Sequence, residues 1–75
     1  MSKELYARIA RAFDAIYAQG DNGLEYMDRH EAMDEELMQH FYNDSVETLS
    51  VADRTRMAEM LEAIAADMDF DLESF

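Results

Sequence analysis

The chain contains no cysteine and no proline, and it has only two glycines among its 75 residues. The lack of cysteine excludes disulfide bridges and metal centres held by thiolates. The lack of proline, with glycine confined to Gly20 and Gly23, favours helices joined by short connections. The two glycines bracket the most obvious turn, so we expect an all-α fold with a connection at this point.

Long hydrophobic runs are missing as well. No apolar run approaches the roughly 18 residues of a membrane span. The N-terminal stretch MSKELYARIARAF has no uninterrupted apolar region of the kind found in secretory signals. Hydrophobic residues nevertheless make up 49% of the chain, which is too many for a disordered acidic tail. We therefore expect one helical domain, residues 1–75, in a cytoplasmic protein that does not enter membranes.

Positive charge is scarce, since the chain has 6 Lys+Arg against 18 Asp+Glu and a net charge of −12. Residues 1–20 contain three cations and two acids, so the entire negative excess lies after residue 20. A negative surface repels nucleic acids and anionic membranes, and neither is expected as a direct partner. Such a surface attracts basic proteins instead. The cations of the first helix, Lys3, Arg8 and Arg11, are expected to face acids of a later helix or of another subunit, or solvent.

The spacing of apolar residues predicts a first helix over residues 3–18. A second helix begins after Asn22, which can act as its N-cap, and ends before the polar residues 43–45. Within this second helix Asp34 can serve as a new N-cap, so a break near residues 31–34 stays open.

Ser50, followed three residues later by Asp53, opens the third helix as a capping box. Beyond Met68 apolar residues alternate with acids in a near period-2 pattern, although their spacing also fits a helix carried to the end of the chain. Since acids oppose the negative pole of a helix C-terminus, we expect an extended or frayed C-terminal segment. The three helices are expected to pack as a small antiparallel three-helix bundle, with four helices if the second one breaks near residues 31–34. The core stripe of the third helix should consist of Met57, Leu61, Ile64 and Met68, with Met60 beside it.

Residues for catalysis or metal binding do not form a recognisable set. The two histidines, His30 and His40, fall on or beside the apolar seam of the second helix, where core-edge roles are the ordinary ones. The stretch Asp67-x-Asp69-x-Asp71 begins like a calcium loop, but it lacks the following glycine and the distal glutamate. We expect neither an enzyme nor a protein with a cofactor or a metal.

Two acidic clusters without neighbouring cations are the candidate binding residues. No Lys or Arg occurs from His30 through Asp53 or after Arg56, whereas ordinary helical surfaces mix both signs. The clusters either keep a small protein soluble or meet a basic partner, with adjacent aromatic residues as apolar anchors. The candidate partner-binding residues are Glu31, Asp34, Glu35, Glu36, Phe41, Tyr42, Asp67, Asp69, Phe70, Asp71 and Glu73.

Methionine is abundant, with seven residues in the chain. Its flexible thioether fills irregular cores, and it also lines adaptable grooves for partner helices. A methionine-lined groove with an acidic rim would accept a basic amphipathic helix.

Together these features predict a non-enzymatic binding protein or inhibitor that occupies a basic, nucleic-acid-binding surface of a partner protein. In size and acidity the chain is similar to small phage-encoded anti-CRISPR and anti-restriction proteins, among them nucleic-acid mimics, a likeness of composition that rests on no diagnostic motif. Two alternatives stay open. One is a homodimeric helical module, structural or adaptor, whose acidity serves only solubility; the other is an antitoxin- or immunity-like protein that neutralises a basic toxin.

Overall fold

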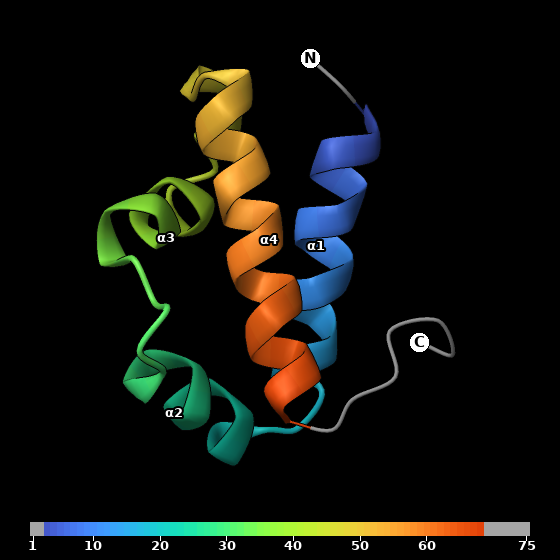
Figure 1. Ribbon diagram of the computed structural model, residues 1–75, viewed down its shortest axis with the longest axis vertical. Coiled ribbons are helices and arrows are strands. Elements are labelled where there is room, and N and C mark those ends of the chain that lie inside the picture. The colour runs from blue at the N-terminus through green and yellow to red at the C-terminus, as the bar shows by residue number, and fades with distance from the viewer. Residues whose placement is uncertain (1–2, 69–75) are drawn as a thin grey trace.

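The structure, a computed structural model, describes residues 3–68 and contains four α-helices in that range (Figure 1). No strand occurs among these residues. The predicted all-α class is confirmed, and the helix count is four because the second predicted helix is broken. The elements in chain order are α1 (Lys3–Tyr17), α2 (Asp21–Arg29), α3 (Glu35–Tyr42), the short 3₁₀ helix η1 (Val46–Thr48) and α4 (Val51–Asp67).

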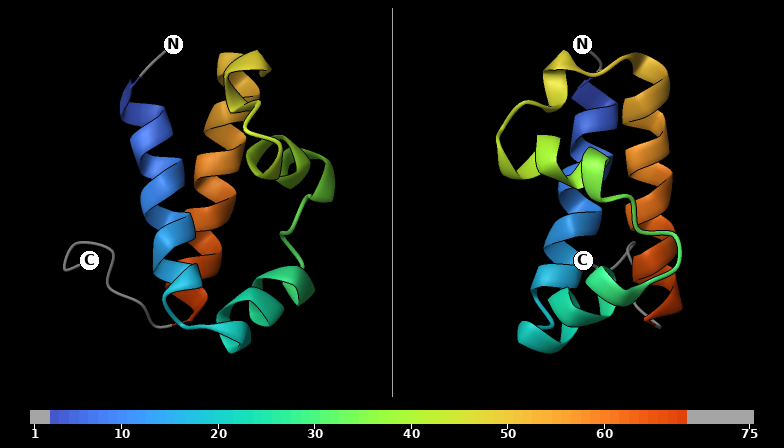
Figure 2. Two further views of the ribbon diagram at one scale, coloured as in Figure 1. Left: turned by 180° about the vertical axis from the view of Figure 1, so that it is seen from behind. Right: turned by 90° about the vertical axis from the view of Figure 1, so that its left-hand side faces the viewer.

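The two long helices, α1 and α4, lie side by side and run in the same direction (Figures 1 and 2). The segment between them, residues 18–50, carries the chain back to the end of the molecule at which α1 begins. On this way back His30 contacts Asp67 at the end of α4, and Asp34 then contacts Arg56 nearer the start of α4. In a three-helix bundle whose successive helices alternate in direction, the first and last helices run parallel. The parallel α1–α4 pair therefore agrees with the predicted small antiparallel bundle, and the return path between them is divided between two short helices.

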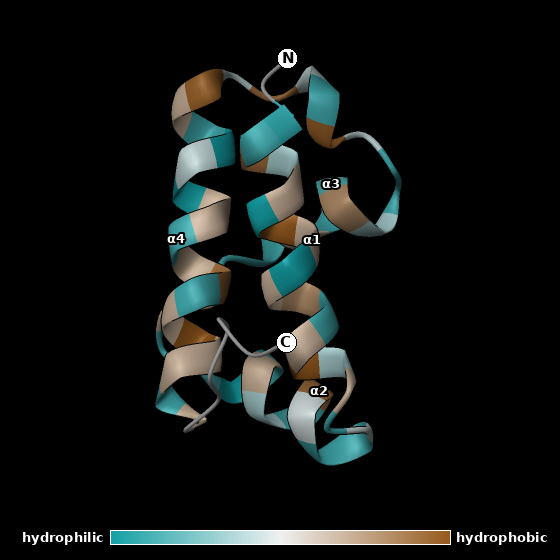
Figure 3. Ribbon diagram, turned by 90° about the vertical axis from the view of Figure 1, so that its right-hand side faces the viewer, coloured by the Kyte–Doolittle hydropathy of each residue, from teal (hydrophilic) through white to brown (hydrophobic). Residues whose placement is uncertain are grey.

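The core lies along the seam between α1 and α4. Ile9 and Ile16 on α1 and Leu61 on α4 have no exposed surface. Alanines on both helices are also fully buried, and such small side chains let two helices approach closely. Figure 3 shows hydrophilic and hydrophobic residues interleaved along both long helices, as amphipathic helices require. The predicted stripe of Met57, Leu61 and Ile64 is buried, as is Met60, while Met68 is half-buried.

The turn between α1 and α2 is set by its two glycines. Gly20 has a φ of 74° and is the N-cap of α2, without a side-chain capping bond. Gly23 packs against α1 so closely that an added Cβ would collide with the carbonyl oxygen of Ile16 and lie 2.7 Å from the Cβ of Gln19. Helix α2 consequently begins at Asp21, and the predicted N-cap role of Asn22 is wrong by two residues, because helix–helix approach decides this start.

The other predicted helix ends agree with the structure. Asp34 is the N-cap of α3, and its Oδ1 accepts hydrogen bonds from the backbone N–H groups of Glu36 at 3.1 Å and Leu37 at 3.3 Å. The Oγ of Ser50 accepts from the N–H of Asp53 at 3.1 Å and caps α4. The segment predicted to be extended or frayed, residues 69–75, lies outside the described residues.

Candidate functional site

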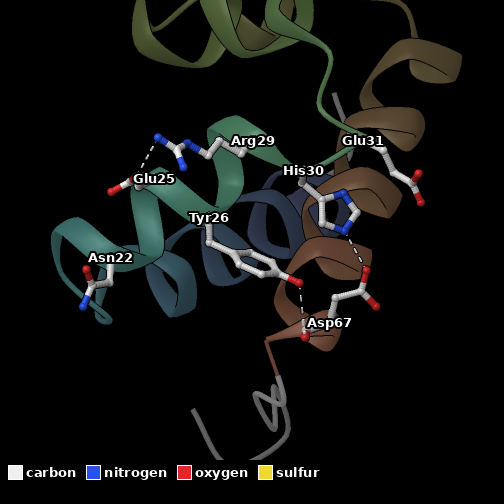
Figure 4. A pocket seen from close by; sticks show the side chains of 7 residues that line it. All are labelled: Asn22, Glu25, Tyr26, Arg29, His30, Glu31 and Asp67. Carbon is white, nitrogen blue, oxygen red and sulfur yellow. Dashed lines mark hydrogen bonds and ion pairs between the residues drawn. The ribbon is translucent and has the colours of Figure 1, made fainter.

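A surface hollow of about 640 Å³ lies between α2 and the C-terminal end of α4 (Figure 4). Tyr26 and His30 point from the α2 side toward Asp67, whereas the ion pair of Glu25 and Arg29 lies on the outer side of α2. The inner part of this hollow is therefore a set of contacts between two helices. Its lining consists of Asn22, Glu25, Tyr26, Arg29, His30, Glu31 and Asp67.

Both ring nitrogens of His30 are engaged. Its Nδ1 accepts a hydrogen bond from the backbone N–H of Ala32 at 3.0 Å, and its Nε2 lies 2.6 Å from Oδ2 of Asp67. This network assigns the hydrogen to Nε2, which donates to the Asp67 carboxylate. The Tyr26 hydroxyl donates to the backbone carbonyl of the same aspartate at 3.4 Å. Because both ring nitrogens of the imidazole are engaged and Tyr26 contacts the same aspartate, the arrangement ties α2 to α4.

His40 has a similar local role at the end of α3. The Ser45 hydroxyl donates to the carbonyl oxygen of His40 at 3.3 Å, and the His40 Nδ1 lies 3.2 Å from the same hydroxyl oxygen. Over residues 3–68, no group of three or more His, Cys, Asp or Glu side chains is arranged to hold a metal ion.

Charge is distributed very unevenly between the parts of the fold. The long helices α1 and α4 together carry five cations and six acids, a net charge of −1. Residues 18–50, which we call the acidic arm, carry nine acids and one arginine, a net charge of −8. The arm includes α2 and α3 and lies across one face of the α1–α4 pair (Figure 2). The negative field of the described residues is thus concentrated on one side of the molecule.

The described ion pairs neutralise the long helices more fully than the arm. Arg8 forms a hydrogen-bonded pair with Glu62 of α4, which raises the pKa of Arg8 further above its ordinary value. This contact confirms that a cation of the first helix faces a later helix, whereas Lys3 and Arg11 pair with no acid among residues 3–68. Seven arm acids make no ion pair with a described residue, namely Asp21, Asp28, Glu31, Glu35, Glu36, Asp44 and Glu47.

The first predicted acidic cluster divides into free and bound members. Glu31, Glu35 and Glu36 are exposed. Asp34 caps α3, and its other carboxylate oxygen lies 3.0 Å from the guanidinium of Arg56. Asp34 therefore holds the arm on α4, while its three neighbours face solvent.

The second predicted cluster is described only at its first residue. Asp67 is exposed, but its carboxylate contacts His30 within the chain. Asp69, Phe70, Asp71 and Glu73 lie outside the described residues, so their predicted roles stay predictions.

The two predicted aromatic anchors differ. Phe41 is half-buried, and its ring packs against Phe13 of α1 with centroids 4.6 Å apart. Tyr42 is 52% exposed, and its ring forms T-shaped pairs with the rings of Phe13 and Phe41, with centroids 6.2 and 6.4 Å apart. Phe41 thus joins α3 to α1. Tyr42 presents an exposed aromatic surface, and its ring packs against Phe13 and Phe41.

A second hollow, of about 360 Å³, lies beside Tyr42 and contains a residue that the sequence did not single out. Asp28 projects to it from α2, although nothing in the local pattern distinguishes this aspartate from other exposed acids. Only the break at residues 30–34 brings the end of α2 next to α3. The lining consists of Asp28, Met33, Glu35, Met38, Gln39 and Tyr42.

Arg54 is the one charged residue in the described core. It is 6% exposed, and its buried Nε finds no hydrogen-bond partner among the described residues. Arg54 precedes Met57 by three positions and so extends the apolar stripe of α4 toward its N-terminus. That spacing is a signal from which its burial could have been predicted.

None of the described helices is long and apolar enough to cross a membrane. Comparison of the chain with known protein families, with curated proteins and with solved structures finds no match.

Proposed function

We propose that this protein is a non-enzymatic binding protein that occupies a basic, nucleic-acid-binding surface of a partner protein, as nucleic-acid-mimicking inhibitors do. The observation that carries the proposal is the acidic arm, with its net charge of −8 and seven carboxylates that pair with no described cation. Unpaired carboxylates on the short helices of the arm and on their connections form a negative field held by the fold, and such a field accelerates encounter with a basic surface and favours correct partners.

The uneven charge distribution favours partner binding over solubility as the role of the acids. A protein that needs acidity only for solubility gains nothing from placing it on one side, because solubility depends on net charge. The near-neutral α1–α4 pair supplies the stable frame, and the arm presents the charge. Tyr42, half exposed on the arm, adds an aromatic contact of the type that contributes most to the stability of protein interfaces.

The test is capture of partners by the immobilised protein from a nuclease-treated lysate of the source organism. Bound proteins should be basic nucleic-acid-binding proteins, and added duplex DNA or RNA should release them by competing for the same surface. Capture should also fall between low and moderate salt.

A matched pair of charge variants separates position from net charge. The arm variant E31Q/E36Q/E47Q and the long-helix variant E4Q/D14N/E59Q each remove three exposed carboxylates that make no described ion pair. The arm variant should lose at least about tenfold in affinity, which corresponds to about 1.4 kcal/mol, and the long-helix variant about twofold or less. Equal losses in both variants, or partners that nucleic acid does not displace, would contradict the proposal.

A homodimer whose acidity serves only solubility gives the opposite pattern. Light scattering would then report twice the monomer mass at micromolar concentration, and neither variant would alter capture of basic proteins.

A further inference from the structure

The hollow beside Tyr42 combines an apolar floor with an acidic rim. Met38, which is 1% exposed, and the half-buried Met33 contribute thioethers, and Tyr42 contributes an aromatic ring. The exposed carboxylates of Asp28 and Glu35 stand at its edge. At about 360 Å³ the hollow is near the lower end of the roughly 300–1,000 Å³ range of ligand pockets, a size suited to one side chain.

Among residues 3–68, no positive charge balances this rim. None of the described cations lines the hollow, and neither Asp28 nor Glu35 forms an ion pair with a described residue. Arg29, which follows Asp28 in sequence, pairs with Glu25 on the outer side of α2. The hollow is therefore complementary in charge to a cation that this part of the chain does not supply.

The ring of Tyr42 is positioned before any partner binds. Its ring lies in T-shaped arrangements with Phe13 and Phe41, with ring centroids 6.2 and 6.4 Å apart, so its orientation is held by packing across α1 and α3. Partial burial raises the pKa of Tyr42, and the negative charge of Asp28 raises it further. The hydroxyl thus stays neutral, and the Asp28 carboxylate acts close to the aromatic surface.

We propose that this hollow receives an arginine side chain from a basic segment of a partner protein, with the guanidinium against the ring of Tyr42 and hydrogen-bonded to Asp28 or Glu35. The inference rests on the proposed function and names the site at which the acidic arm engages its partner. A planar guanidinium can stack on an aromatic face and donate hydrogen bonds to a carboxylate in its own plane at the same time. Its apolar stem suits the methionine floor, because thioethers adapt to irregular contacts.

The experiment uses an acetylated, amidated helical peptide with three arginines on one face and leucines on the other, and a second peptide with citrulline in place of each arginine. Titration into protein labelled at the methionine methyl groups is followed by NMR. The arginine peptide should shift the methyl signals of Met33 and Met38 in a saturable manner, and the signal of Met57, which is fully buried between the long helices, should change little. The citrulline peptide, of the same shape without the charge, should produce no saturable shift.

Matched variants test which residues contribute to the affinity for the arginine peptide. D28N/E35Q should weaken the arginine peptide by at least about tenfold, as expected for the loss of charge-assisted hydrogen bonds. E4Q/D14N, which removes the same charge from α1, should weaken it by about twofold or less. Tyr42→Leu keeps an apolar side chain and should cost about two- to fivefold through loss of the cation–π contact.

Equal binding of the citrulline peptide, equal effects of the two double variants, or shifts that avoid Met33 and Met38 would each overturn the proposed site. The failure of this site can be told from the failure of the proposed function. If D28N/E35Q leaves partner capture unchanged while E31Q/E36Q/E47Q abolishes it, the acidic arm binds a basic surface without using this hollow.

Discussion

The α1–α4 pair forms the packed, nearly neutral core of this small protein, whereas the acidic arm carries most of its net negative charge. The pair joins two long helices through buried alanines, isoleucines and leucine, and its charges nearly balance. The arm consists of two short helices of nine and eight residues and has nine acids against one arginine. Short helices depend on tertiary contacts for their stability. The difference indicates that self-repulsion is tolerated only where a neutral, well-packed frame compensates for it.

The largest expected effect is on the frame. Leu61→Ala removes a fully buried side chain from the seam between α1 and α4 and should lower the free energy of unfolding by about 2–5 kcal/mol. Met33→Ala, at a half-buried position of the arm, should cost clearly less. Urea denaturation followed by circular dichroism measures both, and similar losses would show that arm and frame contribute equally.

Gly23→Ala tests the junction of the two regions. Alanine favours a helix interior over glycine by about 1 kcal/mol, but here its Cβ would collide with the carbonyl oxygen of Ile16. We expect a net destabilisation of about 1–3 kcal/mol. Asn22→Ala, at the exposed neighbouring position in α2, should stay within about 0.5 kcal/mol of the native chain. A more stable Gly23→Ala protein would mean that α2 is not held against α1 in this way.

Arg54→Met should stabilise the frame. The substitution removes a buried Nε that has no described partner and replaces it with an apolar side chain. Since an unsatisfied buried polar group costs about 1–3 kcal/mol, we expect a gain of at most that size and a higher melting temperature. A loss of stability instead would show that the guanidinium has a partner that outweighs its desolvation.

His30→Ala tests the tie between the arm and the end of α4. The substitution leaves the Ala32 N–H and the Asp67 carboxylate without their imidazole partner and should cost about 1–2 kcal/mol. Asp67→Asn should change stability by only about 0.5 kcal/mol, since the amide oxygen still accepts from Nε2 and a negative charge leaves the helix C-terminus. Thermal unfolding at neutral pH compares the two variants.

The smallest effect concerns Tyr42. Asp28→Asn should lower the pKa of Tyr42 only part of the way toward its ordinary value, because burial is the larger cause of the increase and remains. The phenol is neutral at lower pH in both states, so its contribution to stability is complete below the unfolded pKa near 10 and is lost as pH rises through the folded pKa. Ultraviolet difference titration against Tyr42→Phe isolates this tyrosine from the other three.

The helices and most of their ends could be predicted, because they depend on local signals. Asp34 and Ser50 cap their helices as the residue types indicate, and the stripe of Met57, Leu61 and Ile64 faces the core. The start of α2 could not be predicted from Asn22, since the contact of Gly23 with α1 determines it. Within the candidate site, Glu35 and Tyr42 followed from charge and aromatic pattern, whereas Asp28 became part of the hollow only through packing.

By itself the amino-acid sequence determined the all-α class, the caps of α3 and α4 and the concentration of acids after residue 20, because helix period, capping chemistry and charge are properties of neighbours in the chain. Only the tertiary structure decided that Asp34 and Asp67 are held by Arg56 and His30, and that Asp28, Glu35 and Tyr42 share one hollow. These outcomes depend on how the acidic arm folds back across the pair, and the free energy of that packing comes from residues far apart in the sequence.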